Sequence, residues 1–381
     1  MKILITTDYY SPAVNGVVTS VSNLKEGLER QGHEVRILTL SPDTRSHKWG
    51  NDYYISSMNV NWVYPNTRFR LLPAHSFVKE LIEWHPDVVH SQCEFSTYGY
   101  ARKIASACHA PLIHTYHTVY EDYTHYFCPS RHLGRMLVAK FTRDILKHTD
   151  CVIAPSGKVS TLLHGYHVET PTEVVPTGID IERFAAIPSG KWIDTKRKQY
   201  GLTDNTLTLV FIGRLAKEKN VSELLEMLKA CPELPVKLLI VGDGPYRHEL
   251  MKECEHPALA DRVIFTGMVA PTEVNYYYHL GDIFVNASTS ETQGLTYIEA
   301  MAAGLPLLCH KDACLDGIVV DGENGWQYTS PEQFELAIEE VYHDSELKRA
   351  MAWNARFASR EFSKAAFARK VANIYQHCLA G

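Results

Sequence analysis

Short apolar runs alternate with amphipathic stretches along the whole chain of 381 residues, and the pattern starts afresh in its second half. Each run has the length of a strand buried on both faces, and each stretch between runs is long enough for a helix. Such strand–helix repeats form parallel sheets covered by helices. The predicted strands are Lys2–Thr7, Glu34–Leu40, Asp87–Ser91, Leu112–Thr118, Cys151–Pro155, Glu173–Pro176, Leu207–Ile212, Val236–Val241, Val263–Gly267, Ile283–Asn286 and Pro306–Cys309. The sequence therefore predicts an α/β protein with two doubly wound domains in succession.

The predicted helices lie between these strands and at the end of the chain. They are Val18–Arg30, Phe95–Cys108, Val221–Ala230, Tyr246–Cys254, Thr296–Ala303, Pro331–Tyr342 and Ser363–Leu379. The segment Ala185–Asp204 lacks strand character and collects Pro, Gly and charged residues, which is typical of a domain boundary. We therefore assign residues 1–188 to an N-terminal domain and residues 189–362 to a C-terminal domain.

The composition argues against several classes of protein. Lys and Arg number 38 against 44 Asp and Glu, so the basic surplus of a nucleic-acid partner is missing. The nine Cys form no Cys-x-x-Cys pair, and no zinc knuckle or redox pair is expected. The chain starts with MKILITT, which is no secretory leader, and no apolar run approaches the ~20 residues of a membrane span. We expect a cytoplasmic protein with reduced thiols.

Two cations follow the first strand of the second half. In the segment GRLAKEKN, Arg214 comes directly after Gly213, and Lys219 precedes the next helix. Ligands of open α/β sheets bind at the carboxyl ends of strands. Two cations on one short loop there suit a diphosphate whose negative charge grows as it departs. The alternative is a solvated basic loop.

The segment SETQGLTYIEAMAAGLPLL places two carboxylates and a glycine around a helix start. Glu299 lies among apolar residues and needs a partner, which two vicinal ribose hydroxyls would supply. Glu291 and the backbone amides of Gln293, Gly294 and Leu295 could bind sugar hydroxyls. The alternative is a helix-capping Glu291 and a surface Glu299.

Two glycine-containing turns are less specific. Gly242, in VGDGP, permits close approach of the backbone to a ligand, but a tight turn also needs glycine. Asn15 and Gly16 open a helix after the first strand, where backbone N–H groups and the helix dipole could hold an anion. The fingerprint Gly-x-Gly-x-x-Gly is absent, which argues against a dinucleotide cofactor.

Polar aromatic residues gather at one strand end of the first half, in HTYHTVYEDYTHY. His117 closes the predicted strand Leu112–Thr118. A lone histidine is more often structural than catalytic. The neighbouring Tyr116, Tyr120, Asp122, Tyr123 and His125 favour a polar pocket. A zinc site is not expected, because no His or Cys pair here has helical ligand spacing with a third ligand nearby.

The segment Ser130–His148 is predicted to be a basic amphipathic helix. Its basic residues are Arg131, Arg135, Lys140, Arg143 and Lys147, and its apolar residues are Leu133, Met136, Leu137, Phe141 and Ile145. Basic amphipathic helices bind anionic membrane surfaces. The alternative is an ordinary helix that packs its apolar face against the core.

Taken in order, NGVV, HTYHT, VVPTGID, GRLAKEKN, VGDGP and the Glu-x7-Glu of SETQGLTYIE resemble the family 4 retaining glycosyltransferases over nearly the whole chain. The resemblance implies the GT-B fold, in which two Rossmann-like domains face each other across a cleft. The C-terminal domain would bind a nucleotide sugar and the N-terminal domain an acceptor. Residues 363–381 would cross back onto the N-terminal domain.

The resemblance also implies roles for individual residues. They are Arg214 and Lys219 at the diphosphate, Gly16 at a phosphate, Glu299 at the ribose, Glu291 at the sugar hydroxyls, His117 near the transferred sugar, and Met268 and Val269 at the base.

A narrower resemblance concerns the acceptor. NGVVTSVSNLKEGLERQGHEV, the EFS at 94–96 and YHTVYEDYTHY are similar to bacterial diacylglycerol glucosyltransferases, which act at membrane surfaces. This implies UDP-glucose as donor, diacylglycerol as acceptor, and a peripheral position on the anionic inner face of the cell membrane. The expected membrane or acceptor contacts are Arg131, Arg135, Lys140, Arg143, Tyr120 and Tyr123. One departure is Asn15, where many relatives carry a second glycine.

The expected reaction is metal-independent and needs no cofactor. No carboxylate is placed as an obvious nucleophile, so a covalent glycosyl-enzyme is not expected. The diphosphate would leave on the face that the acceptor attacks and would take the acceptor's proton. One alternative is the same donor chemistry with a soluble sugar or polysaccharide acceptor. A lesser alternative is a non-catalytic nucleotide-sugar-binding module.

Overall fold

The computed structural model describes residues 1–13, 15–59, 68–70, 75–121 and 130–380, apart from the side chain of Arg131. The chain divides into two compact units. Unit 1 comprises Met1–Ile179 with Lys364–Gly381, and unit 2 comprises Asp180–Ser363. The predicted boundary segment Ala185–Asp204 lies inside unit 2 and contains helix α7 (Gly190–Gln199). The segment contains no strand, as its lack of strand character predicts, and the two units divide between Ile179 and Asp180.

Unit 1 is built on a sheet with the strand order β10-β9-β8-β7-β1-β2-β4-β3. All neighbouring strands are parallel except β3 and β4. The strands are β1 (Lys2–Thr7), β2 (Glu34–Leu40), β3 (His47–Trp49), β4 (Asp52–Ile55), β7 (Val88–Ser91), β8 (Leu112–Thr115), β9 (Cys151–Ala154) and β10 (Thr172–Val174). Strands β5 (Met58–Asn59) and β6 (Arg68–Phe69) form a separate small pair.

Helices cover both faces of this sheet. They are α1 (Gly16–Arg30), α2 (Ser76–Trp84), α3 (Ser96–Cys108), α4 (Arg131–Leu146), α5 (Gly157–Gly165) and α14 (Lys364–Ala380). Successive residues of a strand point to opposite faces. Accordingly, Ile3 and Ile5 of β1 pack in the core with α1 and α14, whereas Leu4 packs in the core with α2 and α3. The first strand is thus buried on both sides, as its continuous apolar run predicts.

Unit 2 contains an all-parallel sheet in the order β13-β12-β11-β14-β15-β16. Its strands are β11 (Leu207–Ile212), β12 (Val236–Val241), β13 (Val263–Gly267), β14 (Ile283–Asn286), β15 (Leu307–His310) and β16 (Gly325–Tyr328). Besides α7, its helices are α6 (Ile181–Ala185), α8 (Val221–Ala230), α9 (Arg247–Glu253), α10 (Val274–Tyr278), α11 (Leu295–Ala303), α12 (Pro331–His343) and α13 (Ser345–Ser359).

Each sheet has one point where the direction of winding reverses. In unit 1, β2 lies on one side of β1 and β7 on the other; in unit 2, β12 and β14 flank β11 in the same way. The loops that follow the two strands at such a point diverge and leave a crevice at their carboxyl ends. Each unit therefore has its own expected binding edge.

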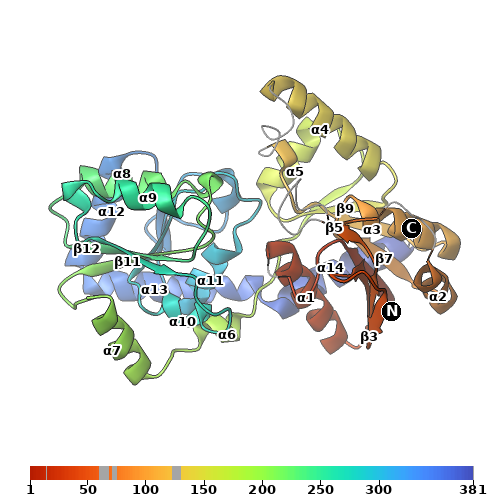
Figure 1. Ribbon diagram of the computed structural model, residues 1–381, viewed down its shortest axis with the longest axis horizontal. Helices are drawn as coiled ribbons and strands as arrows, with labels where there is room; N and C mark the ends of the chain where they lie inside the picture. Colours follow the sequence, from red (N-terminus) through yellow and green to blue (C-terminus); the bar gives the residue numbers. More distant parts are fainter. Residues whose placement is uncertain (14, 60–67, 71–74, 122–129, 381) are drawn as a thin grey trace. The chain divides into compact units, whose positions relative to one another are not determined.

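Helix α4 is the long helix at one end of unit 1 (Figure 1). The face that it buries differs from the predicted one. Its buried residues are Gly134, Val138, Thr142 and Leu146, four residues apart. The apolar residues assigned to the core, Leu133, Met136, Leu137 and Phe141, are exposed, and Ile145 is half-buried. The alternative of an ordinary helix with these residues in the core was therefore wrong for four of the five.

The C-terminal helix α14 packs against α1 within unit 1. Lys364 donates a hydrogen bond from its backbone N–H to the carbonyl of Ile179 (3.1 Å), and its ammonium group pairs with Glu26 at 2.7 Å. The helices meet at Gly27, where an added Cβ would lie 2.6 Å from the Ala368 Cβ. The end of the chain is thereby part of the core of unit 1.

In the described part of the chain, none of the helices combines the length and the apolar character that crossing a membrane requires.

Replacing Gly27 by alanine tests this helix contact. Alanine is favoured over glycine inside a helix by about 0.5–1 kcal/mol. At Gly27, however, the new methyl group would also lie 2.8 Å from the carbonyl oxygen of Lys364. Overpacking of this kind outweighs the helix preference, and we expect the free energy of unfolding to fall by about 1–2 kcal/mol. Urea unfolding measures this change.

The matched control is Gly99→Ala in α3, where an added Cβ meets no atom within 4 Å. This variant should be as stable as the original protein or up to about 1 kcal/mol more stable. Equal stabilisation by both substitutions would show that α1 and α14 do not pack as closely as described.

Candidate functional site

In unit 2, the loops after β11 and β14 meet at the reversal point of the sheet. The hydroxyl groups of Ser288 and Ser290 donate to the carbonyl of Glu218 at 3.4 and 3.1 Å, so one loop is tied to the other. The side chains of Lys219 and Glu291 then form an ion pair, with 2.6 Å between Nζ and Oε1. The sequence predicts both residues as ligand contacts, and the structure brings them together.

The Lys219–Glu291 pair is only partly buried. The two side chains keep 26% and 16% of their exposure, which leaves room for a ligand to contact them. Arg214 follows the end of β11 on the same loop as Lys219 and is exposed. Charges at such a rim retain part of their hydration, so holding them there costs far less than full burial. The loop therefore carries both predicted cationic side chains, of which Lys219 is paired with Glu291.

The glycines of the neighbouring turn are explained by the packing of the loops themselves. A Cβ at Gly242, where φ is +134°, would lie 2.0 Å from the carbonyl oxygen of Gly213. A Cβ at Gly244 would lie 2.2 Å from the carbonyl oxygen of Leu215. Backbone hydrogen bonds, including Leu215 N–H to Asp243 O at 3.0 Å, hold the two turns together. Gly242 is therefore required by the turn without any ligand.

The glycine before α11 is also explained by local packing. Gly294 has a φ of +73°, and a Cβ there would lie 2.2 Å from the ring of Tyr297. Gln293 is buried beside it, and Leu295 is the first helical residue. In the loop after β13, the side chain of Met268 is 81% exposed and that of Val269 is half-buried, so both are more exposed than Gln293.

Glu299 already has one partner within the protein. The hydroxyl of Tyr278 donates to its Oε2 at 2.6 Å. Burial raises the pKa of Glu299, while the Tyr278 hydrogen bond and the charge of Arg183 act in the opposite direction. Glu299 is thus half-buried rather than a surface residue, and Tyr278 supplies a partner that the sequence analysis did not identify.

The binding edge of unit 1 is built from the ends of β1, β7 and β8. Asp8 follows β1 and accepts a hydrogen bond from the backbone N–H of Thr97, 2.8 Å away, at the start of α3. Gln92 follows β7. His117 lies in the loop after β8, which ends at Thr115, earlier than predicted. The distance between His117 Nε2 and Gln92 Oε1 is 2.7 Å.

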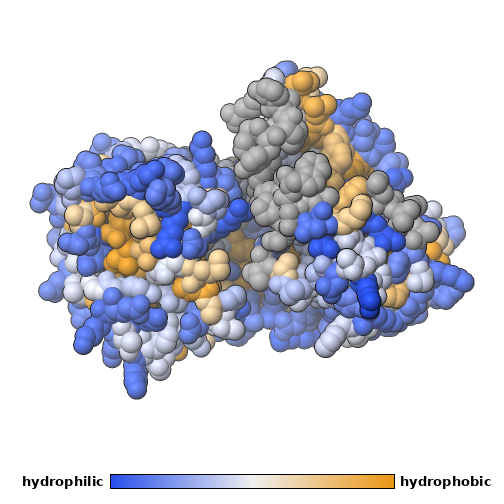
Figure 2. Space-filling view, in the orientation of Figure 1, coloured by the Kyte–Doolittle hydropathy of each residue, from blue (hydrophilic) through white to orange (hydrophobic). Residues whose placement is uncertain are grey.

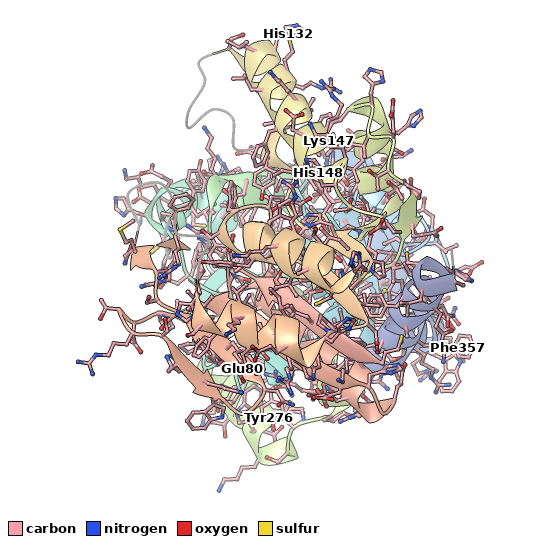
Figure 3. The ribbon with its side chains drawn as sticks, turned by 90° about the vertical axis from the view of Figure 1, so that its right-hand side faces the viewer. Glu80, His132, Lys147, His148, Tyr276 and Phe357 are labelled. Atoms are coloured by element: carbon pink, nitrogen blue, oxygen red, sulfur yellow. The ribbon has the colours of Figure 1, made fainter. Side chains whose placement is uncertain are left out.

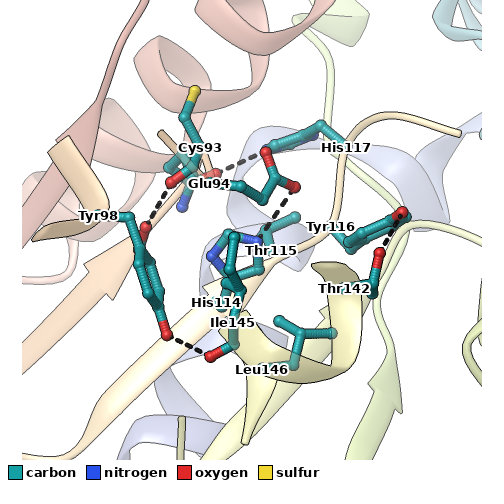
Figure 4. A network of polar contacts seen from close by, with 12 residues as sticks. Cys93, Glu94, Tyr98, His114, Thr115, Tyr116, His117, Thr142, Ile145 and Leu146 are labelled. Carbon is teal, nitrogen blue, oxygen red and sulfur yellow. Dashed lines mark hydrogen bonds and ion pairs between the residues drawn. The ribbon is translucent and has the colours of Figure 1, made fainter. Parts of the chain in front are cut away.

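A second carboxylate, Glu94, organises the neighbouring side chains (Figure 4). Its Oε1 lies 3.3 Å from His114 Nε2, and its Oε2 accepts from the Tyr120 hydroxyl at 2.5 Å. Tyr116 and Thr142 share a hydrogen bond of 3.3 Å, which connects the strand end to α4. Glu94 thus forms a polar network with His114 and Tyr120, and the separate Tyr116–Thr142 pair lies beside it.

Burial sets the protonation states of this edge. Desolvation lowers the pKa of His117 to about 4, with His114 acting in the same direction and Glu94 in the opposite one. Desolvation also raises the pKa of Asp8 to about 6, despite the hydrogen bond from Thr97. Perturbed titrating groups at strand ends are typical of functional sites. The sequence analysis missed Asp8 and Gln92, although each directly follows a predicted strand.

The remaining predicted residues have different surroundings. Asn15 caps α1 by accepting from Val18 N–H at 2.9 Å, and Gly16 begins the helix as predicted. Arg135 pairs with Glu121 at 2.9 Å, and Lys140 is exposed. Arg143 is half-buried and donates to the carbonyl of Tyr166 at 2.7 Å, which gives it a structural role that the sequence did not predict.

The prediction for Tyr123 concerns a residue outside the described ones, as do those for Asp122 and His125; for Arg131, only the backbone is described. Among described residues, no three His, Cys, Asp or Glu side chains lie close enough together to hold a metal ion.

Comparisons with known proteins agree with this arrangement. The model of Glycosyltransferase Family 4 matches residues 14–183, and that of Glycosyl transferases group 1 matches residues 193–357. The chain is 37% identical over 335 residues to alpha-monoglucosyldiacylglycerol synthase of Streptococcus pneumoniae, covering 86% of this chain and 75% of that protein. The chain belongs to the GT-B glycosyltransferases. The synthase of the same name from Acholeplasma laidlawii is 31% identical over 391 residues, covering 98% and 96%.

Solved structures show the same fold for this glycosyltransferase. Anabaena Alr3699/HepE in complex with UDP-glucose superposes with a TM-score of 0.74 at 19% identity, covering 99% of this chain and 100% of that one. Sucrose-phosphate synthase from Thermosynechococcus elongatus gives 0.75 at 22% identity, covering 100% and 99%. The two units are the two Rossmann-like domains of the GT-B fold, as the resemblance implied.

The raised pKa of Asp8 makes stability depend on pH. The folded protein holds its proton up to about pH 6, whereas the unfolded chain loses it near 3.8. Between these values the folded state binds more protons, so stability falls as pH rises, by up to about 3 kcal/mol. Asp8→Asn removes this dependence, and its stability relative to the original protein should improve from pH 4 to pH 7.

Urea unfolding at the two pH values measures the difference. The control is Asp144→Asn. The pair with Lys147 lowers the pKa of the exposed Asp144 below 3.8, so its titration affects stability at lower pH, and the relative stability should change little between pH 4 and pH 7. A difference between Asp8→Asn and the original protein that is constant with pH would contradict the buried, proton-holding state of Asp8.

Proposed function

We propose that this glycosyltransferase moves glucose from UDP-glucose to the free hydroxyl of diacylglycerol at the surface of an anionic membrane, with retention of the anomeric configuration. The observation that carries the proposal is the exposed apolar stripe of α4, which adjoins the polar network at the strand ends of unit 1. The similarity to two alpha-monoglucosyldiacylglycerol synthases supports the same acceptor and sugar.

The stripe consists of four large apolar side chains on one side of α4. Leu133, Met136, Leu137 and Phe141 are 49%, 56%, 50% and 38% exposed. Figure 2 shows apolar residues along this helix, and Figure 3 shows the helix running from His132 towards Lys147 and His148. A contiguous exposed apolar surface marks a site of interaction. Exposed Arg135, Lys140 and Lys147 beside it suit an anionic lipid surface.

Aromatic rings connect this stripe to the polar network. Phe141 stacks on Phe95 with 5.9 Å between ring centroids, and Phe95 meets Tyr120 edge-on at 5.9 Å. The hydroxyl of Tyr120 then donates to Glu94. A lipid acceptor has the same two parts, an apolar body and a polar end. Its acyl chains would lie along the stripe while its hydroxyl reaches the strand ends that carry His117.

The donor would bind at the strand ends of unit 2. Arg214 and Lys219 would hold the diphosphate, Glu291 the sugar hydroxyls and Glu299 the ribose, with the base near Met268 and Val269. Two protein cations on one loop supply the positive charge that a departing diphosphate needs, so the proposed reaction is independent of metal ions and cofactors.

In the proposed step, the acceptor oxygen bonds to the anomeric carbon on the face from which the diphosphate departs. The bond between that carbon and the phosphate oxygen breaks, and its electron pair leaves with UDP. The same leaving group takes the proton of the acceptor hydroxyl. Because attack and departure occur on one face of the sugar, the anomeric configuration is retained. The cations lower the barrier because negative charge accumulates beside them in the transition state.

The decisive experiment supplies the protein with labelled UDP-glucose and anionic vesicles that contain diacylglycerol. The expected product is a glucosyl-diacylglycerol with the α configuration in the lipid phase. Label that appears only in water-soluble oligosaccharide would assign the enzyme a soluble acceptor. Bound but untransferred UDP-glucose, with every acceptor tried, would indicate a binding module.

Removal of Arg214 should slow the chemical step. We expect Arg214→Ala to lower kcat/KM for UDP-glucose by about 10²–10³-fold, as for other groups that stabilise developing negative charge. Lys217→Ala is the matched control, because Lys217 is an exposed cation of the same loop. The initial rate of lipid glucosylation measures both. Equal losses would assign the effect to general electrostatics rather than to a specific contact.

Charges placed in the stripe should release the protein from membranes. We expect the double variant Met136→Asp and Leu137→Asp to lose flotation with anionic vesicles, because apolar burial and charge attraction both weaken. Both side chains are exposed, so folding should be unaffected. Met251→Asp, at an exposed methionine of α9 in unit 2, is the control. Undiminished flotation of the double variant would exclude α4 as the membrane-binding face.

A further inference from the structure

The closest polar partner of His117 is an uncharged side chain. Gln92 is 2% exposed and accepts through its amide oxygen, 2.7 Å from His117 Nε2. An amide oxygen has no proton to donate, so Nε2 of the imidazole must carry the hydrogen of this bond. The amide nitrogen of Gln92 is buried and has no hydrogen-bond partner within the described part of the chain. Gln92 therefore holds the ring by one defined contact.

The other ring nitrogen is left as an acceptor. Because burial lowers the pKa of His117 to about 4, the imidazole is neutral near pH 7. A neutral ring with hydrogen on Nε2 has a lone pair on Nδ1, and this atom has no partner among the described residues. A hydroxyl group is the kind of ligand that such a nitrogen can accept from.

The carboxylates of Asp8 and Glu94, at the same edge as His117, form their hydrogen bonds with other groups. Glu94 favours the charged form of His117, but its oxygens are taken up by His114 and Tyr120. His114 opposes the charged form of His117. Asp8, after β1, is directed to the N-terminus of α3. Among the three side chains Asp8, Gln92 and Glu94 at the ends of β1 and β7, the neutral one contacts His117.

We propose that Gln92 is a positioning residue that fixes His117 as the neutral Nε2–H tautomer and presents Nδ1 as an acceptor for a ligand hydroxyl. The assignment of that ligand to the transferred glucose or its acceptor rests on the proposed function; the tautomer does not. A glutamate in place of Gln92 would stabilise the imidazolium instead and would remove the acceptor. The amide is thus the group that keeps Nδ1 available in a region rich in carboxylates.

Nitrogen-15 spectra of the histidine-labelled protein test the tautomer directly. The His117 signals are assigned by their loss in His117→Gln. The expected pattern is a protonated Nε2 and an unprotonated Nδ1 from pH 5.5 to 8. Gln92→Met should lose this preference and populate both tautomers. A protonated Nδ1 in the original protein, or an unchanged pattern in Gln92→Met, would overturn the proposal.

The pH profile of glucosyl transfer adds a readout that a purely structural role would not change. In Gln92→Glu, the acidic limb of kcat/KM should move upward by about one pH unit or more, because an opposite charge at hydrogen-bond distance stabilises the imidazolium. Gln376→Glu, at an exposed position of α14, is the matched control and should leave the limb in place. An unmoved limb in Gln92→Glu would contradict the positioning role.

The two proposals can fail separately. Protein that transfers no glucose but shows the expected spectra would refute the proposed function and retain the Gln92–His117 assignment. Protein that forms glucosyl-diacylglycerol but shows the other tautomer would refute the assignment alone.

Discussion

Parallel strands bring all their carboxyl ends to one edge of a sheet, and the rest of this structure depends on that constraint. At the reversal point, the two loops that leave adjacent strands must diverge, and their first side chains face the same crevice. In unit 2 these loops carry Lys219 and Glu291, which pair at 2.6 Å although 72 positions separate them in the sequence. In unit 1 the corresponding loops carry Asp8 and Gln92. The topology of the sheet therefore determines which loop positions come together, and the side chains at these positions determine the chemistry.

Most strands were predictable because burial on both faces leaves a continuous apolar run. Six predicted strands match residue for residue: Lys2–Thr7, Glu34–Leu40, Leu207–Ile212, Val236–Val241, Val263–Gly267 and Ile283–Asn286. The elements that were missed lack this signal. Strand β4 starts with Asp52, whose carboxylate is paired with Lys25 at 2.6 Å, and helix α7 buries no residue at all. Their positions follow from tertiary contacts, which local periodicity does not encode.

In helix α4, the periodicity of large apolar residues predicts the wrong buried face. Large apolar residues at helical spacing usually face a core, yet here the smaller set at four-residue intervals does so. Two stripes of suitable period were present in the sequence, and the choice between them depends on the surface opposite the helix. Gly242 shows a similar limit, since its sequence context suits a ligand and a tight turn equally. Only the structure shows that a Cβ added at Gly242 would lie 2.0 Å from the carbonyl oxygen of Gly213, so the turn alone explains this glycine.

The two binding edges also differ in how they treat charge. In unit 2, Lys219 and Glu291 are charged, paired with each other and partly exposed, which keeps the cost of holding these charges low. In unit 1, burial lowers the pKa of His117 to about 4 and raises the pKa of Asp8 to about 6, so the imidazole ring is uncharged near pH 7. In the proposed reaction, the first kind of edge would bind the anionic diphosphate and the second the uncharged hydroxyl of a lipid. The division of charge between the domains therefore follows the division of labour that the proposed reaction requires.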